Sequence, residues 1–181
     1  MHMMEPVTFE RDCEVILIPD GYAITALVGT RGHITQVLGG NWTVQLDTGR
    51  LVRVAAADGD ALGKDVSGVD AVEEEDVEVT EDLVWERLRQ CFDPEIPVNI
   101  VDLGLIYRLH LEDLDNAKKA ISVEMTLTAP GCGMGQVLAD DVEATVRAIP
   151  GVERVDVDVV FDPPWSPDLM TEEARLELGM F

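Results

Sequence analysis

The chain has 181 residues, 46% of them hydrophobic, and a formal net charge of −23. The hydrophobic content is too high for a disordered chain, and the length is enough for one medium domain or two small ones. The charge is −10 over residues 1–79 and −13 over residues 80–181. Neither half offers the basic surface that nucleic acids or anionic membranes attract, so we expect neither as a partner. The acidity serves solubility or attracts cations and basic partners, and the sequence does not separate the two.

The three cysteines, Cys13, Cys91 and Cys132, lack the paired spacing of a disulfide framework or a zinc finger. An odd, unpaired set is typical of a reducing compartment. No stretch reaches the ~18 apolar residues of a membrane span. The segment Met1–Arg11 contains two glutamates and no apolar core, so we do not expect a signal peptide. These features predict a cytoplasmic protein.

The first 60 residues have the pattern of short strands separated by turns. The predicted strands are Glu14–Ile18, His33–Leu38, Trp42–Leu46 and Leu51–Val54. The last two flank Asp47-Thr48-Gly49, which predicts a hairpin. We therefore expect a small, mostly antiparallel β module over residues 1–63, with residues 57–60 in a loop. Residues 64–79 include four consecutive acids, Glu73 to Asp76, and are predicted to form an acidic linker.

From residue 80 the pattern changes to mixed helix and strand. Thr80 is a good N-cap for a helix that ends before Pro94, and Thr171 is one for a short terminal helix. The predicted elements between them are strands Leu105–Leu111 and Ile121–Leu127, helix Val137–Ile149 and strand Val152–Phe161. The order α-β-β-α-β-α predicts an α+β fold, a two-layer sandwich over residues 80–181.

Cys132 lies in a glycine-rich loop, Pro130-Gly131-Cys132-Gly133-Met134-Gly135, between a predicted strand and a predicted helix. The positive end of a helix and nearby backbone N–H groups lower a thiol pKa, into a range of roughly 3.5–7.5 in known cases. The thiolate is the form that binds metal, and the flanking glycines allow the backbone to approach a bulky ligand. The alternative is a buried, inert cysteine.

A second candidate site is the loop that begins at Cys91 and contains Asp93-Pro94-Glu95-Ile96-Pro97. The prolines restrict the backbone, so the carboxylates of Asp93 and Glu95 are held in place and present oxygen ligands suited to iron. The alternative is a structural turn, which the spacing alone favours. Cys91 becomes a second thiolate ligand if this loop and the Cys132 loop meet in space.

Several long motifs resemble one protein family. The run from Asp93 to Tyr107, DPEIPVNIVDLGLIY, and the run from Thr126 to Cys132, TLTAPGC, are similar to the signatures of the PaaD-like family of iron–sulfur assembly domains. The longer SufT form of that family is similar over nearly the whole chain. The SufT form has a comparable N-terminal module, to which residues 35–44 of this chain are similar. It also has a C-terminal tail similar to Phe161-Asp162-Pro163-Pro164-Trp165 of this chain.

The resemblance implies an accessory role in maturing iron–sulfur proteins, with the SUF machinery and apo client proteins as partners. It assigns the family's cysteine to Cys132 and its acidic motif to Asp93 and Glu95, with a transient iron–sulfur cluster or iron as cofactor. A cluster needs about four protein ligands, and Cys132 supplies only one per chain. We therefore expect a homodimer, in which a second chain supplies further ligands.

The sequence is also compatible with two other functions. One is a metal-free adaptor that docks the SUF machinery to clients. The other is an enzyme with Cys132 as nucleophile, which is disfavoured because no motif places a histidine as its base. We therefore expect no enzymatic activity.

Overall fold

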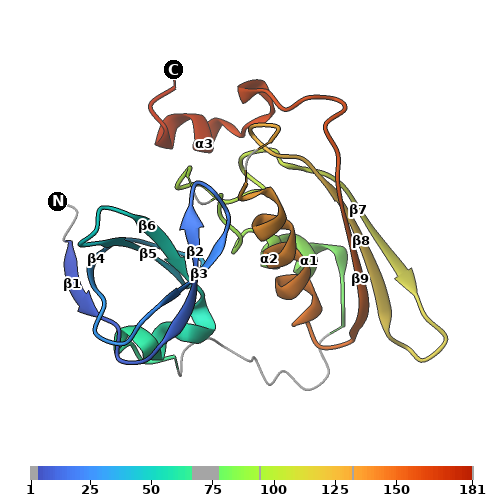
Figure 1. Ribbon diagram of the computed structural model, residues 1–181. Helices are drawn as coiled ribbons and strands as arrows, with labels where there is room; N and C mark the ends of the chain where they lie inside the picture. The colour runs from blue at the N-terminus through green and yellow to red at the C-terminus, as the bar shows by residue number, and fades with distance from the viewer. Residues whose placement is uncertain (1–3, 67–77, 94, 132, 181) are drawn as a thin grey trace. The chain divides into compact units, whose positions relative to one another are not determined.

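The computed structural model describes residues 4–66, 78–93, 95–131 and 133–180. The chain divides into two compact units, Met1–Ala71 and Val72–Phe181, called here the N-terminal unit and the C-terminal unit (Figure 1). The predicted linker, residues 64–79, falls mostly outside the described residues, so its form stays a prediction.

The N-terminal unit is a six-stranded antiparallel sheet (Figure 1). Its strands are β1 (Glu5–Thr8), β2 (Cys13–Ile18), β3 (Ala23–Ala26), β4 (Arg31–Leu38), β5 (Asn41–Leu46) and β6 (Leu51–Val54). Their order across the sheet is β1-β4-β5-β6-β2-β3, so β1 and β3 form its two edges. The predicted hairpin of β5 and β6 is confirmed, with Val44 opposite Val52.

The core of the N-terminal unit comes from alternate residues of these strands. Val44, Val52 and Val54 are completely buried, and Phe9 is nearly so. The expected loop at residues 57–60 was wrong, because a 3-10 helix, Ala56–Leu62, covers this region. That helix buries Ala61 and Leu62 in the core, and its local sequence, rich in alanine, aspartate and glycine, gives little periodic signal.

The C-terminal unit is a two-layer α+β sandwich, as predicted. Its elements are α1 (Glu81–Leu88), β7 (Ile106–Asp113), β8 (Lys119–Met125), α2 (Gly135–Arg147), β9 (Val152–Val159), the 3-10 helix η2 (Pro167–Leu169) and α3 (Glu172–Glu177). Strand β8 is central, antiparallel to β7 and parallel to β9. Helices α1 and α2 cover one face of this sheet (Figure 1).

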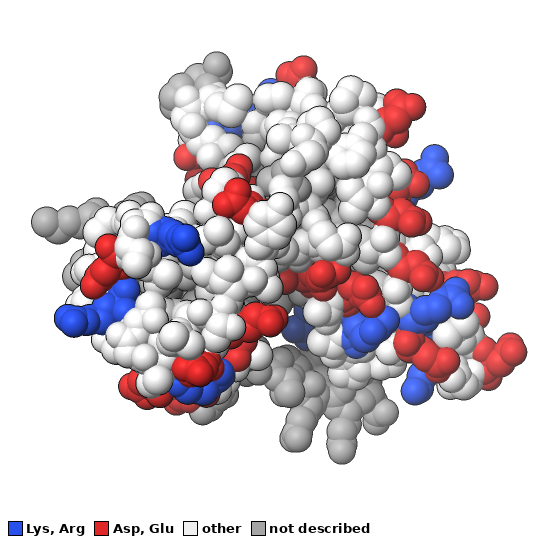
Figure 2. Space-filling view, viewed as in Figure 1, with Lys and Arg blue, Asp and Glu red and all other residues white. Residues whose placement is uncertain are grey.

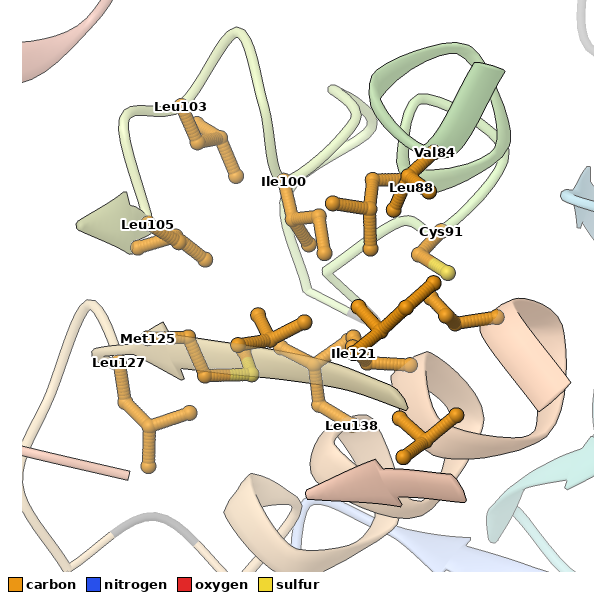
Figure 3. Packing of buried hydrophobic residues seen from close by; sticks show 14 of the residues in the cluster. Val84, Leu88, Cys91, Ile100, Leu103, Leu105, Ile121, Met125, Leu127 and Leu138 are labelled. Carbon is orange, nitrogen blue, oxygen red and sulfur yellow. The ribbon is translucent and has the colours of Figure 1, made fainter. Parts of the chain in front are cut away.

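The core of the C-terminal unit lies between the sheet and the two helices. Strand β8 contributes Ile121, Val123 and Met125, which alternate with the exposed Ser122. Helix α2 contributes one buried row at helical spacing, Leu138, Val142 and Val146, and helix α1 contributes Val84 and Leu88 (Figure 3). The period of two in the strand and of four in the helix is what the sequence pattern predicted.

Both predicted N-caps of the C-terminal unit are confirmed. The Thr80 hydroxyl accepts a hydrogen bond of 3.2 Å from the Leu83 amide, and the Thr171 hydroxyl accepts one of 3.2 Å from the Ala174 amide. Acidic side chains are spread over the face drawn in Figure 2, with basic ones among them. No helix in the described part of the chain is long and apolar enough to cross a membrane.

Candidate functional site

The Asp93 carboxylate organises the loop after α1. Its Oδ1 accepts hydrogen bonds from the backbone amides of Glu95, at 2.9 Å, and of Ile96, at 3.1 Å. The side chain is 7% exposed, and this burial raises the pKa of Asp93 above its ordinary value, although the two amides act in the opposite direction. Asp93 therefore acts on the backbone in a side-chain-stabilised turn. The structural turn is present, and Asp93 helps to build it.

Glu95 is in a different environment from Asp93. Its side chain is exposed, and its amide is fixed by Asp93. Of the two predicted carboxylates, Glu95 is thus the one that faces solvent and can meet a partner or a cation.

A second turn closes the same loop farther along. The Asn99 side chain accepts a hydrogen bond of 2.9 Å from the Asp102 amide and donates one of 2.7 Å to the Asp102 carboxylate. Beside it, the Ile100 amide donates to the Cys91 carbonyl at 2.9 Å, and Phe92 forms an isolated β-bridge with Asn99. The loop from 91 to 105 is therefore held by its own backbone and short polar side chains.

The C-terminal tail braces this loop from outside. The indole Nε1 of Trp165 donates to the Leu103 carbonyl at 2.7 Å, and the Thr171 amide donates to the Asp102 carbonyl at 2.9 Å. Gly104 has φ +74°, and a Cβ there would lie 2.2 Å from the Leu169 carbonyl oxygen. The sequence showed the tail motif and the loop motif but not that one supports the other.

The end of β8 joins this loop to the predicted cysteine loop. The Thr126 amide donates a hydrogen bond of 2.8 Å to the Leu105 carbonyl. The Thr126 hydroxyl is fully buried and has no hydrogen-bond partner among the described residues. Sequence reasoning missed this residue, although a threonine at a buried strand end is a signal that a polar partner is needed.

Cys132 itself lies outside the described residues. Its described neighbours Gly131 and Gly133 are exposed, and Gly131 has φ +79° with open space around its Cβ position. Helix α2 begins three residues later with Met134 as N-cap, which makes no side-chain capping bond, and its first turn contains no acid. The partial positive charge at the N-terminus of α2 is thus not balanced by a capping or acidic side chain in the first turn of the helix.

The other two cysteines are buried. Cys91 is 5% exposed and packs beside Val84 and Leu88 in the core, with its Sγ donating to the Thr145 hydroxyl at 3.4 Å (Figure 3). Cys13 is 2% exposed in the N-terminal unit, where burial raises the pKa of its thiol. Within the described ranges, no three His, Cys, Asp or Glu side chains are grouped to hold a metal ion. The buried setting of Cys91 favours a packing role over the predicted ligand role, which stays a prediction.

Comparisons with known proteins agree on one family. A family model described as iron-sulfur cluster assembly protein matches residues 81–159, within the C-terminal unit. An Fe-S protein maturation auxiliary factor from Porphyromonas gingivalis is 45% identical over 100 residues, which are 55% of this chain and 91% of that protein. This chain belongs to the iron–sulfur cluster assembly protein family.

Two further proteins are similar to this chain over about half of its length. The Fe-S protein maturation auxiliary factor SufT from Staphylococcus aureus is 38% identical and is covered over 96% of its length, which is 49% of this chain. A crystal structure of a domain of unknown function, DUF59, from Bacillus anthracis is 33% identical, with a TM-score of 0.50 over 56% of this chain and 92% of that chain. These likenesses confirm the predicted SufT-like family and fold.

Proposed function

We propose that this protein is an accessory factor in iron–sulfur protein maturation, with the Cys132 thiolate as its key group. The observation that supports this most directly is the match of about half of this chain, over nearly the full length of each relative, to proteins named as Fe-S protein maturation auxiliary factors. In this proposal the iron or the iron–sulfur cluster is a cargo that is bound briefly and passed to an apo client.

The chemistry follows from the position of Cys132 in the sequence, two residues before the N-cap of α2. The first turn of α2 has backbone N–H groups without a side-chain cap and no acid that would offset the positive helix end. Such a position favours the thiolate over the thiol, and the thiolate is the form that binds iron. The exposed glycines on both sides leave room for a bulky cargo.

Asp93 and Glu95 have separate tasks in this proposal. Asp93 fixes the turn through the amides of Glu95 and Ile96, and the exposed Glu95 carboxylate then serves as an oxygen ligand or a docking contact. Cys91 is buried among aliphatic side chains, so its participation requires the loop to open. One thiolate does not complete a cluster, and the remaining ligands come from a second chain, a small thiol or the client.

The partners that fit are the SUF machinery and apo clients, and the role is accessory, not enzymatic. The second candidate function is an adaptor that docks the machinery to clients without touching metal. The acidic surface and the exposed Pro163-Pro164 segment suit that role equally well.

A complementation experiment separates the two functions. In a strain that lacks the protein, the activity of an iron–sulfur client enzyme is measured with wild-type, Cys132→Ser, Cys13→Ser and Glu95→Gln chains at equal abundance. The carrier function predicts loss of client activity with Cys132→Ser, a partial loss with Glu95→Gln and full activity with Cys13→Ser. Full client activity with Cys132→Ser would favour the adaptor.

A further inference from the structure

A groove, called here the α1 groove, runs along the outer side of helix α1. It has a volume of about 600 Å³. Its lining consists of Asp82, Trp85, Glu86, Arg89 and Val101. The four helix residues are spaced i, i+3, i+4 and i+7, so they share one face of α1. The opposite face carries Val84 and Leu88, which belong to the core (Figure 3).

The apolar part of the α1 groove consists of Trp85 and Val101. Both are half-buried and pack against the core of the C-terminal unit. The indole Nε1 of Trp85 donates a hydrogen bond of 3.3 Å to the Glu81 carboxylate, so the ring is held by its own helix. An aromatic face held in this way attracts a cation through the quadrupole of the ring. Val101 belongs to the loop from 91 to 105, so an occupant of the groove also contacts that loop.

Three charged side chains line the same groove. Asp82, Glu86 and Arg89 are all exposed. Within the part of the chain that the structure describes, none of the three side chains forms a hydrogen bond or an ion pair. Asp82 and Glu86 are four residues apart and lie next to Trp85 on the same helix face. Both carboxylates are therefore available to a ligand that contacts the Trp85 ring.

The charges of the protein favour a basic partner as the occupant. Two carboxylates beside an aromatic ring complement a cation, and the net charge of −23 attracts basic proteins from a distance. A second copy of this chain carries the same charge and is repelled. The acidic run from Glu73 to Asp76 of the chain itself is a poor occupant for the same reason.

We propose that the α1 groove binds a lysine or arginine side chain of a partner protein, flanked there by apolar residues. The cationic group contacts the Trp85 ring and the carboxylates of Asp82 and Glu86, and an apolar neighbour packs on Val101. Arg89 lies about one helical turn beyond Trp85, so its charge keeps the cation at the acidic end of the groove. The groove adds partner recognition to the accessory role proposed above. It uses neither cysteine nor iron, so either proposal can fail alone.

The test follows the indole N–H signals in two-dimensional nitrogen–proton NMR spectra of the full-length, metal-free protein. The probe is the peptide acetyl-Leu-Arg-Leu-amide, and the control is its citrulline analogue, which has the shape of arginine without the charge. The arginine peptide is expected to shift the Trp85 signal with a millimolar dissociation constant, while the Trp42 and Trp165 signals stay in place. The citrulline peptide should bind more weakly by on the order of tenfold.

Two substitutions in the α1 groove should change the affinity in opposite directions. Glu86→Gln removes an attractive charge and should weaken binding of the arginine peptide by about two- to fivefold, whereas Arg89→Gln removes a repulsive charge and should strengthen it by a similar factor. Glu112→Gln is the matched control, because Glu112 is an exposed acid of β7 outside the groove lining, and it should bind like wild type.

Four results would overturn the proposal. The first is a Trp85 signal that the arginine peptide leaves unchanged, or that moves no more than the Trp42 and Trp165 signals. The second is equal affinity for the citrulline peptide. The third is a change of affinity in the same direction for Glu86→Gln and Arg89→Gln. The fourth is a Glu112→Gln protein that binds as weakly as Glu86→Gln, which would show attraction to the acidic surface as a whole.

Discussion

The indole of Trp165 and the carbonyl of Leu103 are joined by a hydrogen bond of 2.7 Å across 62 residues of sequence. This contact ties the C-terminal tail to the loop that contains Asp93 and Glu95. Two neighbouring contacts act in the same place, from Thr171 to Asp102 and from Leu169 to Gly104. The tail is thus a structural part of the candidate site.

Replacing Trp165 by Phe tests this brace. The substitution keeps most of the apolar surface and removes the donor, which leaves the Leu103 carbonyl without this bond. We expect a loss of about 1–2 kcal/mol in the free energy of unfolding, and faster amide exchange at residues 99–105. Urea unfolding and hydrogen exchange measure the two effects. Trp42→Phe, in the N-terminal unit, is the control and should leave exchange in this loop unchanged.

The contact between Gly104 and Leu169 gives a sharper test. Gly104→Ala places a Cβ 2.2 Å from a backbone oxygen at a positive φ, so we expect a loss of more than about 2 kcal/mol. Gly179→Ala is the matched control, because Gly179 has φ +70° with nothing within 4 Å of its Cβ position. It should lose only the backbone term of roughly 1 kcal/mol. Equal losses for the two variants would contradict the close approach of tail and loop.

Asp93 predicts a pH dependence whose sign follows from its burial. Its folded-state pKa is raised, so the native protein binds this proton more tightly than the unfolded chain does. The stabilisation from protonated Asp93 is present below about pH 4 and is lost as the pH rises through the raised pKa. Asp93→Asn keeps the acceptor oxygen without the charge, so its stability relative to wild type should increase from about pH 4 toward neutrality.

Asp93→Ala separates the charge from the hydrogen bonds. It removes the acceptor for the amides of Glu95 and Ile96 as well as the charge, so we expect Asp93→Ala to be about 1–3 kcal/mol less stable than Asp93→Asn at all pH values. Thermal unfolding of both variants between pH 4 and pH 8 measures these effects. An Asn variant that is as unstable as the Ala variant at pH 7 would show that the turn requires the carboxylate.

The three thiols should differ in reactivity. Burial raises the pKa of Cys13, and both Cys13 and Cys91 are almost inaccessible, so we expect slow alkylation of both in the native protein. Cys132 should react first, with an alkylation rate that reports a lowered pKa. Mass spectrometry after timed treatment with iodoacetamide over a pH series measures this order. Reaction of Cys13 or Cys91 at the rate of Cys132 would show that the site is misassigned.

Periodicity in the sequence was enough to predict the C-terminal unit. The alternation in Ile121, Val123 and Met125 and the Thr80 and Thr171 caps are local features, and all are present in the structure. In the N-terminal unit the short strands β1 and β3 were missed. Strand β1 contains Pro6, and β3 has two alanines in four residues, so neither carries a clear apolar alternation.

The site could be predicted only in part, for a physical reason. The turn at Asp93 forms because its carboxylate accepts hydrogen bonds from the amides two and three residues later in the chain. An aspartate followed by a proline in a loop is a local pattern that indicates such a turn. The hydrogen bond from Trp165 is accepted by the backbone carbonyl of Leu103. Every residue type has such a carbonyl, so the sequence does not indicate which residue accepts the bond. The buried hydroxyl of Thr126 was missed because a threonine signals the need for a polar partner only where it is buried, and that burial comes from the tertiary packing at the end of β8.

The most direct test of the central claim is the visible absorption of the protein after anaerobic reconstitution with iron and sulfide. We expect a labile charge-transfer absorption with less than one cluster per chain, which Cys132→Ser abolishes and Cys13→Ser leaves unchanged. Cys91→Ser should keep the absorption, because that side chain belongs to the core. A wild-type protein that takes up no iron under any reducing condition, or a Cys132→Ser protein that takes up as much as wild type, would contradict the claim.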